Sequence, residues 1–403
     1  GRVMAVWSVT SLQDIRSTRR ADSEFSRPEY LFAERRVRAS DFVELGCLGG
    51  FVPGPFGSAF HVQNYDFKSP YRYIRGNDVK PFFLLNDDNR YLPAADFQRL
   101  SQYEVCNDDL MISVVGTLGN VAICTEEDVP AMFSCKSTLF RSKEADPYFL
   151  LAYLNSAPGL LCMLRRQRGA IQSGLNIEDL RTIPVPRFQK EIELGIADDV
   201  RTAHRELLNS REAYSAAQRI LEAELGLDTL TFQKPVGYVA QFSDMETSRR
   251  SDAQHYQPRF KQLIDHLSSY PAAPVREIRS LNRRGLQPIY LRNGTVDVVN
   301  SQHLGPKHID YDGLVKTSAK SFAAAPEAHI QQDDLLIYTT GAYIGRTNVY
   351  LSDVPALASN HVNILRLRPG IDAAYMALVF QSAVGQFQTQ QHARGSAQAE
   401  LYP

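Results

Sequence analysis

The chain has 403 residues, 44% hydrophobic and 22% charged, with 44 Lys and Arg against 45 Asp and Glu and a formal charge of −1. This composition is typical of an ordinary folded protein and excludes a disordered chain, a collagen and a coiled-coil fibre. No run of about 18 apolar residues occurs, so no membrane-spanning helix and no membrane partner are expected. The near-zero charge at first argues against nucleic acid, because DNA-binding proteins usually carry a basic surplus.

The N-terminus lacks the long apolar core and cleavage site of a signal peptide, and Met4 is the expected natural start. The five cysteines form no Cys-x-x-Cys pair, so buried free thiols of a reducing cytoplasm are predicted. A zinc site is the alternative, and no spacing supports it. The cysteines are Cys47, Cys106, Cys124, Cys135 and Cys162.

The chain repeats itself. The Arg-Arg-x-Asp sequence at 19–22 recurs 230 residues later at 249–252, and the Asp-Asp-Leu sequence at 108–110 recurs 225 residues later at 333–335. Near the ends of the two copies, Arg168, Gly169 and Gln172 match Arg394, Gly395 and Gln398. The period is too long for a solenoid, whose repeats span about 20–50 residues. At a length that allows two or three domains, the repeat predicts two whole domains of the same fold.

Each copy is expected to mix helices and strands. Residues 108–125 predict two short strands around a glycine-containing turn, and 335–350 repeat this pattern. Asp146 followed by Pro147 predicts the start of a helix that runs to about Asn155. Residues 373–381 are its counterpart in copy two. The predicted fold class is therefore α/β (α+β).

Residues 188–225 predict one long helix. Apolar residues recur there at alternating spacings of three and four from Ile192 to Leu221, which is a heptad seam and indicates a partner helix. The expected partner is a second such helix after copy two. By the repeat, roughly 50 residues, a short tail and this helix, would follow copy two and are not in this sequence. An amphipathic helix packed on its own domain is the alternative.

The predicted domains are 1–187, a connector helix at 188–232, and 233–403. Their net charges are 0, −4 and +3, so the acidity lies in the connector, where proteins rather than phosphates would dock. Motifs of common enzymes are absent: there is no GxGxxG, GxxxxGK[ST], HExxH or GxSxG sequence. No catalytic residue and no metal site are therefore predicted.

Five segments together are similar to a known family. They are residues 54–58 (GPFGS), 73–79 (YIRGNDV), 109–119 (DLMISVVGTLG), 168–172 (RGAIQ) and 183–186 (IPVP). In this order they resemble the DNA-specificity (S) subunits of type I restriction-modification systems. Copy two lacks the Gly-Pro-Phe-Gly-Ser loop and is interpreted as having residues 289–294 (IYLRNG) in place of the Tyr-Ile-Arg stretch.

The resemblance implies two target recognition domains, each reading one half of a split double-stranded DNA site. It implies long helices that pair in an antiparallel coiled coil and dock two methyltransferase (M) subunits, with endonuclease/translocase (R) subunits joining the complex. The chain itself would be a non-catalytic protein of the prokaryotic cytoplasm without a cofactor, because S-adenosylmethionine would bind to the partner methyltransferase. The alternatives are the recognition region of a single-chain restriction-methyltransferase, a duplicated interaction scaffold, or an enzyme of unrecognised type.

Polar side chains on loops are the candidates for base and phosphate contacts. In copy one these candidates are Arg72, Arg75, Asn77, Thr117, Asn120, Lys136, Arg165, Arg166, Arg168 and Gln172. In copy two they are Arg292, Asn293, Thr340, Tyr343, Arg346, Asn360, His361, Arg394 and Gln398. Residues that specify different half-sites should differ between copies, which favours Asn77, Lys136, Tyr343 and His361 over the matched pairs.

Overall fold

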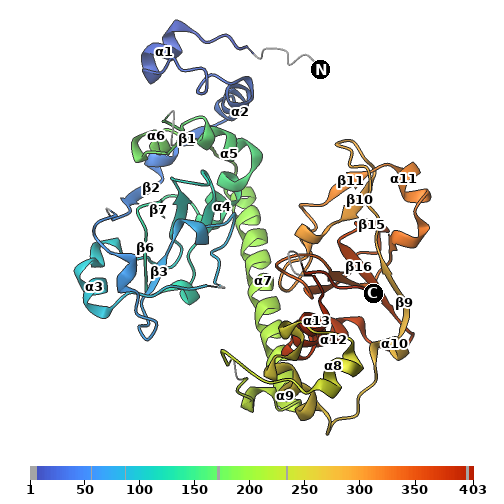
Figure 1. Ribbon diagram of the computed structural model, residues 1–403. Helices are drawn as coiled ribbons and strands as arrows, with labels where there is room; N and C mark the ends of the chain where they lie inside the picture. Colours follow the sequence, from blue (N-terminus) through green and yellow to red (C-terminus); the bar gives the residue numbers. More distant parts are fainter. Residues whose placement is uncertain (1–6, 56, 87, 170–172, 233–234, 396–398) are drawn as a thin grey trace. The chain divides into compact units, whose positions relative to one another are not determined.

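The computed structural model describes residues 7–55, 57–86, 88–169, 173–232, 235–395 and 399–403. The chain divides into two compact units, Gly1–Ser210 and Arg211–Pro403 (Figure 1). Each unit combines short helices with small open sheets, as the predicted mixed fold class requires. No single helix among the described residues is long and apolar enough to cross a bilayer. The adjoining helices α4 (Pro147–Asn155) and α5 (Ala157–Leu164), bent by 75°, together have the necessary length and composition.

Unit 1 is built on a four-stranded antiparallel sheet. Its strand order is β2 (Gly49–Pro53), β7 (Ser137–Ser142), β4 (Leu110–Ser113) and β5 (Val121–Ile123). Two smaller sheets are parallel β3 (Arg72–Ile74) with β6 (Ala131–Phe133), and antiparallel β1 (Phe42–Glu44) with β8 (Pro184–Pro186). The hairpin predicted at 108–125 is the pair β4–β5.

Seven helices of the described chain begin in unit 1. They are α1 (Leu12–Thr18), α2 (Pro28–Arg38), α3 (Ala94–Arg99), α4 (Pro147–Asn155), α5 (Ala157–Leu164), α6 (Ile177–Arg181) and α7 (Lys190–Glu224). Asp146 caps α4 as predicted, because its carboxylate accepts a hydrogen bond of 2.9 Å from the Tyr148 N–H, and Pro147 opens the helix. Apolar side chains of α4 and α5 pack with those of β4, β5 and β7 in one core.

Unit 2 contains two four-stranded sheets. One has the order β14 (Thr347–Val349), β13 (Leu335–Tyr338), β16 (Val362–Leu367), β9 (Arg279–Arg284), and the other β11 (Val315–Thr317), β10 (Val296–Val299), β15 (Ala356–Ala358), β12 (His329–Ile330). Its helices are α8 (Phe242–Ser248), α9 (Pro258–Leu267), α10 (Val275–Ile278), α11 (Ala319–Ala323), α12 (Ala373–Gln381) and α13 (Ala383–His392). The hairpin β13–β14 and helix α12 lie where the sequence predicts them.

Unusual backbone conformations recur at matched positions in the two units. Arg19 and Arg249 both have φ of 53°, and Asp108 and Asp333 both have φ of 66°. Residues other than glycine rarely adopt these left-handed φ values. Their recurrence at matched positions therefore indicates a shared local fold. Glycines with positive φ likewise coincide in the β4–β5 and β13–β14 turns.

The structure corrects the counterpart of the Tyr-Ile-Arg stretch. β3 runs parallel to β6 with Ile74 opposite Phe133, and β10 runs parallel to β15 with Val299 opposite Ala358. Asn300 therefore occupies the position of Arg75, and residues 289–294 lie outside this match. Sequence alone could not find this pairing, because the two strands share their place in the sheet rather than their residues.

Part of the long helix α7 packs against neighbouring elements of this chain. Ile196 and Val200 pack against the core of unit 1, where Ala197 is fully buried, and the Tyr214 hydroxyl donates to Gln381 within unit 2. These contacts favour the amphipathic alternative for part of the seam. Other apolar side chains of α7 are exposed, namely Ile192, Leu194 and Ile220. Pairing with a second helix stays a prediction.

All five cysteines are free, but the prediction that they are buried is wrong for three of them. Cys124 and Cys162 lie in the core of unit 1, whereas Cys47, Cys106 and Cys135 are exposed. Cys47 ends a short 3-10 helix (Leu45–Cys47), and Cys106 and Cys135 lie in loops at the surface. Burial raises the pKa of the Cys124 thiol, which keeps it protonated and unreactive at neutral pH.

In each unit, a buried aspartate at one end of a four-stranded sheet binds an arginine of the neighbouring strand. The sheet is β2–β7–β4–β5 in unit 1 and β14–β13–β16–β9 in unit 2, and each is called the main sheet of its unit. In unit 1 the Asp109 carboxylate, 1% exposed, accepts two hydrogen bonds of 2.8 and 2.7 Å from Arg141 and one from the Cys106 N–H. In unit 2 the fully buried Asp334 does the same with Arg366 and the Gln331 N–H. This forked geometry is the strongest arrangement of an Arg–carboxylate pair.

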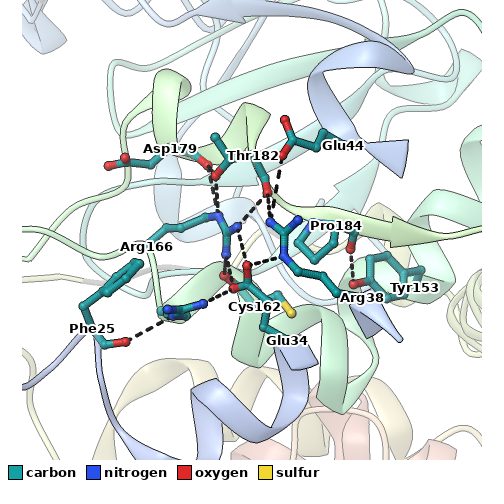
Figure 2. A network of polar contacts seen from close by, with 11 residues as sticks. Phe25, Glu34, Arg38, Glu44, Tyr153, Cys162, Arg166, Asp179, Thr182 and Pro184 are labelled. Carbon is teal, nitrogen blue, oxygen red and sulfur yellow. Dashed lines mark hydrogen bonds and ion pairs between the residues drawn. The ribbon is translucent and has the colours of Figure 1, made fainter. Parts of the chain in front are cut away.

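A second polar network lies in unit 1 (Figure 2). Glu34 of α2, 4% exposed, accepts hydrogen bonds from Arg38 and Arg166 and forms an ion pair of 2.8 Å with Arg165. Arg166 also donates to Thr182 and to the Cys162 carbonyl. Burial raises the pKa of Glu34, but Arg166 and Arg165 outweigh it and lower that pKa to about 2.

We expect Asp109→Asn and Asp334→Asn each to lower the free energy of unfolding by about 1–3 kcal/mol, because each change places an amide N–H₂ against a guanidinium that needs an acceptor. Urea unfolding followed by circular dichroism measures the loss. Glu144→Gln, an exposed acid of unit 1, is the matched control. Equal stability of Asp109→Asn and Glu144→Gln would show that the buried pair contributes nothing.

The lowered pKa of Glu34 predicts a pH-dependent contribution to stability. Since the folded-state pKa lies below the ordinary value of 4.5, the contribution is complete above pH 4.5 and disappears as the pH falls toward 2. Glu34→Gln should therefore cost about 3 kcal/mol of unfolding free energy at pH 7, and the difference from the original protein should shrink below pH 4.5. Glu29→Gln, on the exposed side of α2, should show no such dependence. A difference for Glu34→Gln that stays constant from pH 7 to pH 3 would contradict the assignment.

Candidate nucleic-acid interface

Several loops of unit 1 meet at the end of the main sheet opposite Asp109. The N–H groups of Val114 and Val115, which follow β4, both donate to the Lys136 carbonyl, which precedes β7. Leu175 N–H donates to the Val114 carbonyl, which brings in the segment after α5. We call the described residues of 75–77, 114–120, 134–136 and 168–174 loop cluster 1.

Glycine is required at two positions of loop cluster 1. A Cβ atom at Gly119, whose φ is +83°, would lie 2.7 Å from the Leu160 side chain. A Cβ atom at Gly76 would lie 2.9 Å from Cβ of Lys136, which shows how closely the turn after β3 approaches the segment before β7. Asn77 and Lys136 are therefore near neighbours in space although they are far apart in the sequence.

Unit 2 has a matching assembly of loops. Thr339 N–H donates to the His361 carbonyl, Gly341 N–H to the Ala399 carbonyl, and Leu401 N–H to the Thr339 carbonyl. We call the described residues of 339–346, 359–361 and 394–400 loop cluster 2. It lies at the end of β13 and the start of β16, opposite Asp334.

Arg284, at the end of β9, contacts loop cluster 2 and is not among the residues predicted from the sequence. Its Nε donates to the Asn360 carbonyl, its Nη2 donates to Thr340 Oγ1 at 3.1 Å, and its Nη1 forms an ion pair with Glu400. Arg284 and Tyr402 together lower the pKa of Glu400. The only signal in the sequence was the glycine that follows Arg284, which allows close approach to the Ala358 and Ser359 carbonyls.

The predicted DNA-binding residues of unit 1 fall into two groups, those without a described side-chain partner and those with a hydrogen bond or ion pair. Asn77, Thr117 and Lys136 are exposed, and no hydrogen bond from their side chains is described. Asn120 donates to the Val79 carbonyl. Two predicted arginines form ion pairs near the surface: Arg75 with Asp78 and Asp88, and the half-exposed Arg168 with Asp179. Gln172 lies outside the described residues.

Three predicted arginines are corrected by their burial. Arg72, 5% exposed, forms an ion pair with the buried Asp128 and donates to the Leu85 carbonyl at 2.6 Å. Arg165 and Arg166 are buried against Glu34 and belong to the network of Figure 2. An arginine already held by a carboxylate inside the fold cannot reach a base edge from that position, so we remove these three from the candidates.

In unit 2, loop cluster 2 brings together six of the predicted residues, and Arg292 and Asn293 are not among them. Those two are exposed in a turn next to β11, where Leu291 N–H donates to the Lys316 carbonyl. Gln398 lies outside the described residues. The six that meet are Thr340, Tyr343, Arg346, Asn360, His361 and Arg394.

Tyr343 and Arg346 form the most prominent feature of loop cluster 2. The Tyr343 ring is about half exposed, and the Arg346 guanidinium stacks 3.6 Å from its centroid. Elsewhere in loop cluster 2, Asn360 Oδ1 and His361 Nδ1 are buried and have no hydrogen-bond partner. Stacked Arg, amide and imidazole groups on loops are the side chains that suit contacts with base edges and phosphates.

Among the described residues, no group of three or more His, Cys, Asp and Glu side chains is arranged to hold a metal ion. The loop clusters therefore offer binding groups of the amide, hydroxyl, guanidinium and ammonium classes. Each cluster lies at one end of a hydrogen-bonded sheet, which holds its loops in place.

Neither a scan against protein-family models nor a search of curated proteins found a match. Among solved structures, the S subunit of a type I restriction-modification system from M. genitalium is 14% identical, with 86% of this chain and 79% of that chain covered and a TM-score of 0.42. The HsdS subunit from Thermoanaerobacter tengcongensis is 15% identical, with 90% and 85% covered and a TM-score of 0.28. A chain from a study of complex assembly in the type I R-M system is 14% identical, with 87% and 81% covered and a TM-score of 0.29. The structural neighbours over most of the chain thus include specificity subunits of type I restriction-modification systems.

Proposed function

We propose that this chain is the DNA-specificity subunit of a type I restriction-modification enzyme, a non-catalytic adaptor in which each unit reads one half of a bipartite DNA target. One observation carries the proposal: the two units share a framework, and their loop clusters differ. The Asp109–Arg141 and Asp334–Arg366 forks and the paired left-handed residues are the same in both units.

The differences between the loop clusters are of the kind that sequence reading requires. The turn after β4 presents Thr117, whereas the turn after β13 presents the Tyr343–Arg346 stack. The segment before β7 presents Lys136, whereas the one before β16 presents Asn360 and His361. Because each base pair offers its own donor and acceptor pattern in the major groove, two clusters with different donors would read two different half-sites.

Helix α7 suits the docking of partner proteins. Its first turn is acidic, and it exposes the apolar side chains of Ile192, Leu194 and Ile220. In this proposal the helix pairs with a second helix of the same kind and docks two methyltransferase subunits, and endonuclease/translocase subunits complete the complex in the prokaryotic cytoplasm. Methyl transfer from S-adenosylmethionine to adenine then takes place on the partners.

The charge distribution fits an adaptor whose affinity for DNA arises in the complex. Residues 1–187 are neutral, and residues 233–403 carry only +3. With so few cations in surplus, few counterions would be released when the isolated chain binds a duplex, so weak binding that falls with salt is expected for the chain alone.

The proposal predicts that Lys136 contributes to DNA affinity and Lys143 does not. The two lysines are exposed and flank the same strand, β7, with Lys136 in loop cluster 1 and Lys143 at the opposite end. In the assembled methyltransferase, Lys136→Ala should weaken binding to the cognate duplex about tenfold and Lys143→Ala should leave it unchanged, as measured by fluorescence anisotropy. Equal affinities of the two variants would remove loop cluster 1 from the interface.

Unit 2 offers a second matched pair. Arg346 lies in loop cluster 2, and the exposed Arg368 follows β16 at the far end of the sheet. Arg346→Ala should cost about 1–3 kcal/mol of cognate binding and reduce discrimination in one half-site only, whereas Arg368→Ala should cost nothing. A loss spread evenly over cognate and mismatched duplexes would indicate a phosphate contact rather than base reading. No loss for Arg346→Ala would contradict the role of the stack.

A further inference from the structure

A cavity of about 560 Å³ lies in unit 1 beside α2 and α5, next to the network of Figure 2. Three carboxylates line it, against five arginines, so its polar lining carries an excess of two positive charges. The arginines are Arg20, Arg35, Arg38, Arg165 and Arg166.

Three of these arginines already share one carboxylate partner. Arg38, Arg165 and Arg166 all bind the Glu34 carboxylate, as described above. Asp179, one of the other lining carboxylates, is held by Arg168. The cationic groups that no carboxylate of the lining holds are Arg20 and Arg35.

Arg20 is buried but incompletely bonded. Its side chain is 8% exposed, and its Nε and Nη2 bind the Asp22 carboxylate at 2.9 Å each, with Nη2 also donating to the Gln167 carbonyl. The remaining nitrogen, Nη1, is buried and has no hydrogen-bond partner. A buried donor on a charged group without an acceptor is costly, and native proteins rarely retain one without a reason.

The matched arginine of unit 2 shows what is missing. Arg250 forms the same fork with Asp252, and its Nη2 donates to the Ala393 carbonyl. Its Nη1, however, donates to the Gln391 carbonyl at 3.0 Å. The same position is therefore fully bonded within unit 2 and lacks one acceptor in unit 1, where it lines the cavity.

We propose that this cavity binds a phosphate group, with Arg20 Nη1 and the Arg35 guanidinium as its donors. Arg35 is exposed on α2, and no hydrogen bond or ion pair of its side chain is described, so it is free to turn toward an anion. A phosphate presents several acceptor oxygens at once, which matches two guanidinium groups approaching from different elements. Because Glu34 and Asp179 are held by their own arginines, their charges oppose the anion less than free carboxylates would.

The phosphate group has two possible sources, a free anion and the backbone of a nucleic acid. Inorganic phosphate is the probe for the site itself, because its binding requires neither DNA nor a partner protein. Only the second source rests on the proposed function, and competition by a short duplex DNA distinguishes the two.

Isothermal titration calorimetry of the full chain with inorganic phosphate, at ionic strength held constant with chloride, tests the site. We expect saturable binding of one phosphate per chain, weakened about tenfold by Arg35→Ala through the loss of one charge-assisted hydrogen bond. Arg36→Ala is the matched control, because Arg36 is exposed on the same helix, stacks near Phe32 and does not line the cavity.

A second pair of variants tests the buried donor. Arg20→Gln should abolish phosphate binding, whereas Arg250→Gln, which removes the equivalent Arg–Asp fork from unit 2, should leave it intact. No saturable binding by the original chain, or an equal loss with Arg35→Ala and Arg36→Ala, would overturn the proposal. If duplex DNA displaces phosphate, the group comes from a nucleic-acid backbone, and if it does not, the site takes a free anion. Either result leaves the site established, and failure of the DNA-reading proposal would not change the phosphate result.

Discussion

The buried aspartate–arginine fork is the constraint on which each unit depends. Asp109 immediately precedes β4 and Arg141 lies on β7, so the fork fixes the register of the two central strands at one end of the sheet. Asp334 and Arg366 do the same for β13 and β16. With one end of the sheet fixed by a forked ion pair, the opposite end can hold loops whose own sequences contribute little to stability. The loop clusters and the stabilising pair thereby lie at opposite ends of the same strands.

In the proposed function, that separation lets one fold carry two specificities. The loop clusters vary in length and side chains because their backbones are held by hydrogen bonds to neighbouring loops, such as those that Lys136 and His361 accept through their carbonyls. The exposed side chain of Lys136 remains available to a ligand. A change of Lys136, Tyr343 or Arg346 therefore alters the presented donors without disturbing the cores beneath.

Sequence reasoning identified the elements whose signals are local. The hairpins at 108–125 and 335–350 and the start of α4 at Pro147 were predicted from neighbouring residues and are present. The site was less predictable, because the burial of an arginine depends on an acid far away in the chain. Arg72 meets Asp128, and Arg166 meets Glu34, 132 residues apart, and neither pairing leaves a local trace. The counterpart of Arg75 was misplaced for a similar reason, since strand β10 matches β3 in its sheet position alone.

In the proposed function, the two units read the two halves of one split DNA target. Mapping adenine methylation across a genome in cells that express this chain with its methyltransferase partner tests this claim directly. We expect a bipartite motif with an unread spacer. Replacing Tyr343 and Arg346 by alanine should relax the bases of one half and leave the other half unchanged. A continuous motif, a motif that relaxes in both halves, or methylation that does not depend on this chain would contradict it.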